Sequence, residues 1–290
     1  METDKYKKAL KEHAFSLTNE KVTEKVSKII AENFAENNNK DVYKLLYSCI
    51  DLTTLNSTDT REHVWKLTEK VNAFEGSNPE IENVAAICVY PNFAKTVKEA
   101  LTSDVKIASV SGGFPTSQTF TEVKIAETAL AVADGADEID IVLNLGLFLN
   151  EEYEEMCEEI MEIKHACHEA HLKVILETGA LKDVRKIHQA AVLAMYSGAD
   201  FIKTSTGKGY EGATPEAAFA MCSAIKSYYG KTGTKIGFKV SGGVSTVEDA
   251  VKYYTIVKEI LGSEWLSPTL FRIGTSRLAD TLLSEIQKPK

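Results

Sequence analysis

Eight short apolar runs recur from about residue 42 onward, and longer amphipathic stretches separate them. The runs span residues 46–51, 84–89, 105–111, 138–143, 172–177, 200–204, 235–240 and 270–274. The stretches with helical periodicity include residues 121–134, 151–170, 182–197, 215–229 and 246–261. This alternation of strand and helix predicts βαβ units and a parallel sheet.

Eight such units in about 245 residues fit a TIM (β/α)8 barrel, which typically needs about 250 residues. The rival fold is a doubly wound open sheet. The chain lacks the Gly-x-Gly-x-x-Gly fingerprint after its first strand, which favours the barrel. No linker rich in Pro, Gly or Ser divides the chain. We therefore predict a single barrel domain over residues 41–290.

Residues 1–40 have a different pattern, without any strand signal. Val22, Val26, Ile29, Ile30 and Phe34 recur at helical spacing, with charged and polar residues between them. We predict that these residues form a helical N-terminal extension that packs on the barrel.

Composition excludes several classes of function. The formal net charge of -9 argues against nucleic-acid binding, which needs a basic surface. No apolar stretch reaches the roughly 18 residues of a membrane span, and the charged N-terminus is unlike a secretory signal. The five cysteines are odd in number and form no Cys-x-x-Cys pair, which favours reduced thiols and a cytoplasmic location.

Four charged residues interrupt the apolar strands of the predicted barrel. Successive side chains of a strand point to opposite faces, so Asp51, Asp140, Lys203 and Lys239 should all point into the interior. Barrel interiors are normally packed with branched apolar residues, and active sites lie at the carboxyl ends of the strands. These charges therefore predict a functional site. The alternative is a buried ion-pair network without chemistry, which adds little stability over an apolar core.

The two lysines and two aspartates suggest a reaction class. Two ammonium groups on adjacent strands repel each other, so one amine can lose its proton near neutral pH. A neutral lysine amine is a nucleophile that forms Schiff bases with carbonyl compounds. An ionised aspartate can act as a general base, directly or through a water molecule. The set suits carbon–carbon bond formation or cleavage through an imine.

Small residues follow the last three predicted strands. Gly207 follows the sixth strand, Gly242 and Gly243 follow the seventh, and Gly274 and Ser276 follow the eighth. In barrels, the loops after the last two strands often hold a phosphate group, together with helix N-termini. Ordinary turns between strand and helix also contain glycine, so each turn alone is a weak signal. Beside the lysines, together they predict a phosphorylated substrate.

Several segments resemble the deoxyribose-phosphate aldolase family. The matching segments are residues 51–56, 138–142, 200–208 and 237–244, supported by residues 85–91 and 264–274, the last closer to the eukaryotic branch. The resemblance runs in the expected order from about residue 42 to residue 286. It implies a class I aldolase on a TIM barrel that needs neither metal nor cofactor. Such enzymes cleave 2-deoxy-D-ribose 5-phosphate reversibly to acetaldehyde and D-glyceraldehyde 3-phosphate.

The resemblance also implies a role for each matching position. Lys203 corresponds to the Schiff-base lysine, Lys239 to the lysine that tunes it, and Asp140 to the acid/base residue that works with a water. The implied substrate-binding residues are Asp51, Thr206 and Lys208. The implied phosphate-binding residues are Gly207, Gly242, Gly243, Gly274 and Ser276. The expected partner is a small phosphorylated sugar, and assembly into a homo-oligomer stays open.

The chain departs from the family pattern near the predicted phosphate site. Val240 and Ser241 stand where Pro-Ala is usual, Ser245 replaces a usual Arg, and Arg277 replaces a usual Ser or Thr. Many members also carry a C-terminal tail that ends in Tyr, whereas this chain ends in Pro-Lys. Besides this aldolase, two hypotheses remain. One is another Schiff-base barrel of the transaldolase or keto-acid aldolase type, and the other is a weakened barrel that serves as a protein-binding scaffold.

Two further groups of residues invite a functional interpretation that their spacing does not support. His165, Cys167, His168 and His171 match no zinc template, so we predict an exposed helix face there. Cys88 should point inward, but no histidine is placed in sequence to activate it. We therefore predict a small core residue rather than a nucleophile.

Overall fold

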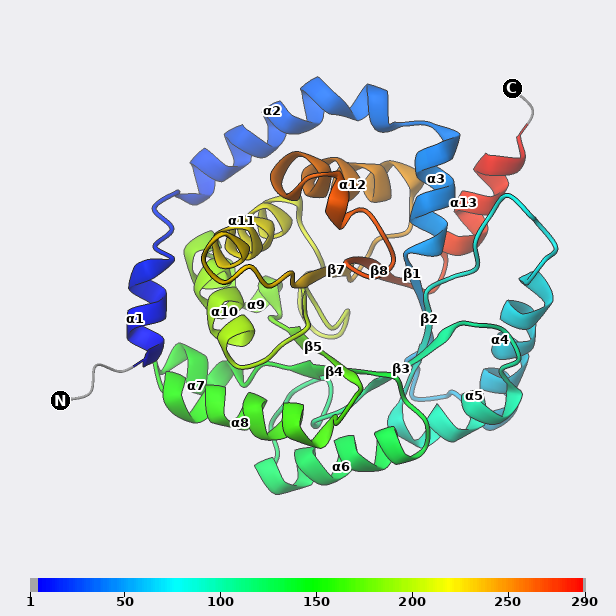
Figure 1. Ribbon diagram of the computed structural model, residues 1–290, viewed down its shortest axis with the longest axis horizontal. Coiled ribbons are helices and arrows are strands. Elements are labelled where there is room, and N and C mark those ends of the chain that lie inside the picture. Colours follow the sequence, from blue (N-terminus) through cyan, green and yellow to red (C-terminus); the bar gives the residue numbers. More distant parts are fainter. Residues whose placement is uncertain (1–4, 289–290) are drawn as a thin grey trace.

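The computed structural model describes residues 5–288 of the chain (Figure 1). Eight parallel strands follow one another in sequence order around a closed barrel, as predicted, and this excludes the open sheet. The strands are β1 (Ile50–Thr53), β2 (Ala86–Val89), β3 (Lys106–Val110), β4 (Glu138–Val142), β5 (His171–Ile175), β6 (Phe201–Lys203), β7 (Gly237–Ser241) and β8 (Phe271–Thr275).

Helices surround the barrel and include the five stretches that were expected (Figure 1). The α-helices are α1 (Lys5–Glu12), α2 (Asn19–Asn37), α3 (Lys40–Ser48), α4 (Arg61–Phe74), α5 (Ala94–Ala100), α6 (Thr121–Ala133), α7 (Leu145–Leu149), α8 (Tyr153–Ala166), α9 (Thr178–Leu181), α10 (Val184–Tyr196), α11 (Pro215–Thr232), α12 (Val247–Leu261) and α13 (Leu278–Gln287). Two short 3-10 helices are η1 (Pro91–Phe93) and η2 (Ser263–Trp265). In the described part of the chain, none of these helices is long and apolar enough to cross a membrane.

The N-terminal part of the chain is helical, as expected, and packs on the outer layer of helices. Helix α2 contacts α11 and α12, and α1 contacts α10 (Figure 1). Val22 and Val26 are buried in this contact, and the side-chain amide of Asn37 donates a hydrogen bond of 3.1 Å to Thr255 on α12. The proposed division of the chain at residue 40 stays a prediction.

The first predicted strand is partly wrong. Residues 46–48 belong to α3, which begins after Asn39, whose side chain accepts hydrogen bonds from the backbone of Asp41 and Val42. Val42 and Leu46 are both buried and lie one helical turn apart, so the apolar run continues the buried face of this helix. A short apolar run does not separate strand from helix by itself, and here only Ile50–Thr53 forms the strand.

The predicted helix face that carries three histidines is also wrong. Helix α8 ends at Ala166, and His168 adopts a positive φ of 49° in the following turn. Cys167 is fully buried, and His171 begins β5. The turn ends the helical periodicity that the prediction assumed, so these side chains do not share a face.

Candidate active site

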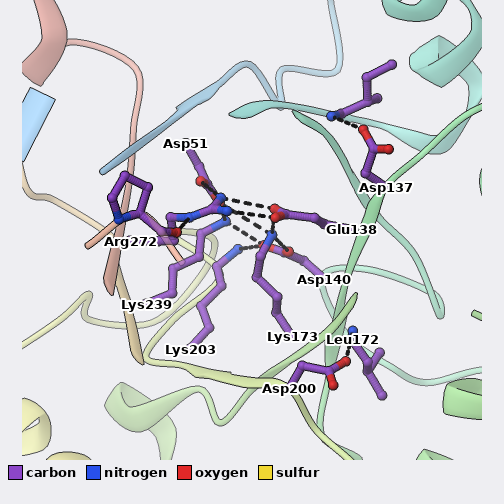
Figure 2. A network of polar contacts seen from close by, with 12 residues as sticks. Asp51, Asp137, Glu138, Asp140, Leu172, Lys173, Asp200, Lys203, Lys239 and Arg272 are labelled. Carbon is purple, nitrogen blue, oxygen red and sulfur yellow. Dashed lines mark hydrogen bonds and ion pairs between the residues drawn. The ribbon is translucent and has the colours of Figure 1, made fainter. Parts of the chain in front are cut away.

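Seven charged side chains meet inside the barrel and form what we call the charged cluster (Figure 2). Its members are Asp51 on β1, Glu138 and Asp140 on β4, Lys173 on β5, Lys203 on β6, Lys239 on β7 and Arg272 on β8. None is more than 5% exposed to solvent. The four charged residues expected in the interior are therefore brought together.

The register of the parallel strands explains why these side chains meet. Lys203 on β6 is the direct neighbour of Lys239 on β7, and Lys239 is in turn the neighbour of Arg272 on β8. On the other side, Asp140 pairs with Lys173 across β4 and β5. Each of these residues follows an apolar residue that faces the helices, so alternation points the charged side chains inward at similar heights.

Asp140 lies at the centre of the charged cluster. Its Oδ2 accepts hydrogen bonds from Lys203 Nζ and Lys239 Nζ, both at 2.8 Å. Its Oδ1 accepts a hydrogen bond from Lys173 Nζ at 3.0 Å. One carboxylate therefore serves three amino groups, which is an unusual load for a buried anion.

The remaining two carboxylates, Asp51 and Glu138, bind the other three cations of the cluster. Asp51 accepts from Lys239 Nζ at 2.5 Å and from Arg272 Nη1 at 2.7 Å. Glu138 lies 2.6 Å from Lys173 Nζ and 2.7 Å from Arg272 Nη2. Lys203 has no contact with either of these two carboxylates in the described structure. Within residues 5–288, its ionic partner is Asp140 alone.

Glu138, Lys173 and Arg272 were not among the residues expected in the site. The signal that found the others was present for them too. Lys173 stands between Leu172 and Val174, just as Lys203 follows Ile202. Arg272 likewise stands between two apolar residues of β8, and Glu138 lies two positions before Asp140, on the same face of β4.

The environment shifts the pKa values of Lys203 and Lys239 in opposite directions. Burial lowers the pKa of Lys203, Asp140 opposes this effect, and the positive charge of Lys239 lowers the pKa further. Burial also acts to lower the pKa of Lys239, but the carboxylates of Asp140 and Asp51 outweigh it, so the pKa of Lys239 is raised. Burial is thus a larger cause for Lys203 than the neighbouring ammonium group, which the sequence argument had put first.

The carboxylates keep their negative charge despite their burial. Burial alone would raise the pKa of Asp140, but Lys173, Lys203 and Lys239 hold it well below its usual range. The pKa of Asp51 is lowered by Lys239, Lys173 and Arg272 against the same opposing effect. An ionised Asp140 next to a lysine of lowered pKa is an arrangement that can move protons at neutral pH.

A cavity of about 430 Å³ opens above the charged cluster, at the carboxyl ends of the strands. Of the seven charged residues, only Lys203 lines it. The wall includes the other expected positions Thr206, Gly207, Lys208, Gly242, Gly243, Gly274 and Ser276, together with Ser245 and Arg277. Asp51, Asp140 and Lys239 lie beneath this wall, so Asp51 contacts other protein groups here rather than the cavity.

Local backbone conformation and close packing explain why glycine occupies several positions of the cavity wall. Gly242 and Gly243 both have positive φ values, of 90° and 87°. A Cβ atom on Gly242 would lie 2.8 Å from the Cα of Gly212, a contact that only a shift of the backbone could relieve. A Cβ atom on Gly274 would lie 3.1 Å from the Cε of Lys239, so this glycine also makes room for the lysine.

Thr206 and Lys208 are held at the cavity wall by hydrogen bonds. The hydroxyl of Thr206 donates to Glu177 at 2.5 Å, and Lys208 Nζ donates to the carbonyl of Leu55 at 2.6 Å. Glu177 was not expected in the site. It follows β5 in a left-handed conformation with a φ of 51°, and burial raises its pKa.

The structure does not support a metal site or a reactive cysteine at the other candidate positions. Within residues 5–288, no group of His, Cys, Asp and Glu side chains has an arrangement suited to a metal ion. Cys88 is fully buried on β2, and burial raises the pKa of its thiol. A thiol with a raised pKa is a poor nucleophile, which agrees with the prediction of a core residue.

Comparison with known proteins identifies the family. A sequence model described as "DeoC/LacD family aldolase" matches residues 45–264. The chain is 42% identical to human deoxyribose-phosphate aldolase over 250 residues, which cover 82% of this chain and 77% of the human protein. It is 41% identical to the bovine enzyme over 252 residues, with coverage of 83% and 78%.

Solved structures show the same architecture. An aldolase named QR15 superposes with a TM-score of 0.70 and 30% identity, over 83% of this chain and 96% of that one. Deoxyribose phosphate aldolase from Aeropyrum pernix, described as a tetramer, superposes with a TM-score of 0.70 and 26% identity, over 89% and 98% of the two chains. With the family model and the human and bovine relatives, these matches show that the chain belongs to the DeoC/LacD family of aldolases.

Proposed function

We propose that the chain cleaves 2-deoxy-D-ribose 5-phosphate reversibly to D-glyceraldehyde 3-phosphate and acetaldehyde, through a Schiff base on Lys203. One observation carries this proposal. Lys203 is the member of the charged cluster that lines the cavity, and its pKa is lowered while that of Lys239 is raised. A buried amine that is both neutral and reachable is the group that a carbonyl substrate meets.

The reaction begins on the aldehyde carbon of the open-chain sugar phosphate. The neutral Nζ of Lys203 attacks this carbon, and a proton moves to the oxygen to give a carbinolamine. Loss of water then leaves a protonated imine. When a base takes the proton of the C3 hydroxyl, the bond between C2 and C3 breaks. Its electron pair moves toward the imine to form an enamine, and C3 becomes the aldehyde of glyceraldehyde 3-phosphate.

The enamine is then protonated at C2, and hydrolysis of the resulting imine releases acetaldehyde and free Lys203. Asp140 is the proton carrier for these steps because it is ionised and lies 2.8 Å from Lys203 Nζ. It lies beneath the cavity wall, so a water molecule would relay its protons to more distant substrate atoms. Lys239 stays charged and keeps Asp140 in place through its own 2.8 Å bond.

The phosphate group fits the loops after β6, β7 and β8. Gly207, Gly242 and Gly243 allow the backbone to approach an anion closely, and Ser276 adds a hydroxyl. Arg277 lines the same part of the cavity, its side chain is exposed, and helix α13 begins at the next residue. We propose that it provides the positive charge that Ser245 lacks.

The cellular setting follows from the same reasoning. All five cysteines are buried, and none is joined to another by a disulfide, which suits the cytoplasm. With this substrate, we propose that the enzyme works in deoxyribonucleotide catabolism. The A. pernix relative is described as a tetramer, and we propose that this chain also assembles into a homo-oligomer.

Turnover of different substrates tests the proposal. The purified chain should release D-glyceraldehyde 3-phosphate from 2-deoxy-D-ribose 5-phosphate and should use acetaldehyde as the donor in the reverse direction. A preference for dihydroxyacetone or pyruvate as donor would instead favour another Schiff-base aldolase. No turnover of any of these by a correctly folded chain would favour the scaffold hypothesis.

A further inference from the structure

The charged cluster contains one more basic group than it has acidic groups. Three carboxylates, from Asp51, Glu138 and Asp140, face three lysines and Arg272. If every group were ionised, a net positive charge would be buried away from water, which is costly. The cluster is neutral when one of the lysines is neutral.

The contacts indicate which lysine that is. Lys173 has three carboxylates within 3.5 Å, namely Asp51, Glu138 and Asp140, and Lys239 has two. Lys203 has one, and it shares the Oδ2 atom of that carboxylate with Lys239. In agreement, the neighbours of the other three basic groups raise their pKa values against burial, whereas the pKa of Lys203 is lowered.

Lys173 occupies the position that decides this distribution. It does not line the cavity, so it meets no substrate, but it binds the Oδ1 atom of Asp140 at 3.0 Å. Glu138 holds Lys173 from the other side at 2.6 Å. Of the three lysines that lower the pKa of Asp140, Lys173 has the largest effect, ahead of Lys203 and Lys239.

We propose that Lys173 is a positioning residue for the reaction at Lys203, and that it acts through Asp140. Its ammonium group compensates part of the negative charge of Asp140. Without Lys173, Lys203 would use that charge as its counter-ion, so the presence of Lys173 leaves Lys203 neutral. This inference rests on the proposed role of Lys203 as the nucleophile. Glu138 has the opposite effect in this scheme, because it takes up part of the charge of Lys173.

Other groups near Lys203 do not replace this control. Lys239 and Asp140 are its closest charged neighbours, on β7 and β4. Cys88 on β2 and Glu177 after β5 also act on it electrostatically. The pKa of the Cys88 thiol is raised by burial, and the carboxylate of Glu177 is bonded to Thr206. Among the described residues, Asp140 is the carboxylate that forms an ion pair with both Lys173 and Lys203.

The experiment measures how readily Lys203 forms an imine as a function of pH. Wild type and three variants, Lys173→Met, Lys173→Arg and Glu138→Gln, are incubated with acetaldehyde and cyanoborohydride from pH 6 to pH 10. The reduced adduct on the peptide that contains Lys203 is quantified by mass spectrometry. Near-ultraviolet circular dichroism checks that each variant is folded.

The expected shifts have opposite signs. In Lys173→Met the cluster is electrically neutral when Lys203 keeps its proton. The pH at which Lys203 is trapped should therefore rise, and the rate of trapping at pH 7 should fall by about tenfold. Lys173→Arg keeps the charge and should trap like the wild type. Glu138→Gln removes a carboxylate, so its trapping should move to lower pH. If Lys173→Met does not fold, the Glu138→Gln and Lys173→Arg profiles decide the question.

Two failures can be told apart. In the first, the wild type forms the adduct on Lys203, but folded Lys173→Met or folded Glu138→Gln shows the same pH profile as the wild type. This result would overturn the role of Lys173 and leave the proposed function intact. A wild-type chain that forms no adduct on Lys203 would remove the proposed function, and this inference with it.

Discussion

The charged cluster inside the barrel and the cavity wall above it are built in different ways. We call this wall the mouth; it includes Gly207, Gly242, Gly243, Gly274, Ser276 and Arg277. The cluster consists of side chains from strands, all buried and each bonded to another member. The mouth consists of turns in which glycines with positive φ shape the backbone, and Ser276 and Arg277 are exposed. Strands fix the chemistry rigidly, whereas loops can change with the substrate. Changes in the cluster should therefore alter rate and pH dependence, and changes in the mouth should alter substrate affinity.

Replacing the nucleophile tests the cluster most severely. Lys203→Met should lower kcat/KM by at least about 10⁴-fold, because no other residue of the cluster reaches the cavity. The measurement is release of D-glyceraldehyde 3-phosphate. Lys106→Met is a matched control, since Lys106 is an exposed lysine at the opposite end of a barrel strand, and it should keep full activity. Activity retained in Lys203→Met would contradict the account.

The next largest effect should come from Lys239→Leu. Removal of this positive charge raises the pKa of Lys203, so less of the amine is neutral at pH 7 and kcat/KM should fall by about 10²-fold. Part of the rate should return at alkaline pH, where the amine loses its proton. Rate measurements from pH 6 to pH 10 check this. An equal loss at every pH would show that Lys239 has another role.

A substitution in the mouth should affect affinity instead of rate. Arg277→Ser should raise KM for the phosphorylated sugar by about tenfold, which is the loss of one charged hydrogen bond to phosphate. The kinetics with unphosphorylated 2-deoxyribose should stay unchanged. Arg185→Ser, which alters an exposed arginine paired with Asp183, is the control. A fall in kcat for both sugars would place Arg277 in the chemistry and remove the distinction between the two regions.

The smallest effect separates two neighbouring glycines. Gly243→Ala meets no atom within 4 Å and strains only a backbone with positive φ, at about 1 kcal/mol. Its KM should change by a few fold at most. Gly242→Ala should cost more in both thermal stability and KM, because its Cβ atom would press on Gly212. Equal effects of the two substitutions, in unfolding and in kinetics, would argue against this shape of the mouth.

Strand alternation predicted much of the interior from sequence alone. It placed Lys203 and Lys239 in the lumen because each follows an apolar residue that faces the helices. The same rule applies to Lys173 and Arg272, which also stand between apolar residues of their strands but were not predicted. The partners of each charge could not be predicted, because they depend on strand register and on the reach of long side chains around a closed barrel.

The errors in the predicted fold came from local sequence signals that are compatible with more than one backbone structure. Residues 46–48 are apolar and suit either a strand or the buried face of a helix. Here the spacing from Val42 and the capping by Asn39 extend α3 to Ser48. Near His168, a single left-handed residue ends a helix that periodicity alone would continue. Such turns are set by backbone conformation, which few residue types reveal in advance.

Reductive trapping with the true substrate tests the central claim most directly. The chain is mixed with 2-deoxy-D-ribose 5-phosphate at pH 7, reduced with borohydride, digested and mapped by mass spectrometry. If Lys203 is the neutral amine of the charged cluster, the adduct appears on the peptide with Lys203 and on no other. An adduct on Lys239 or Lys173, or none at all, would contradict the account.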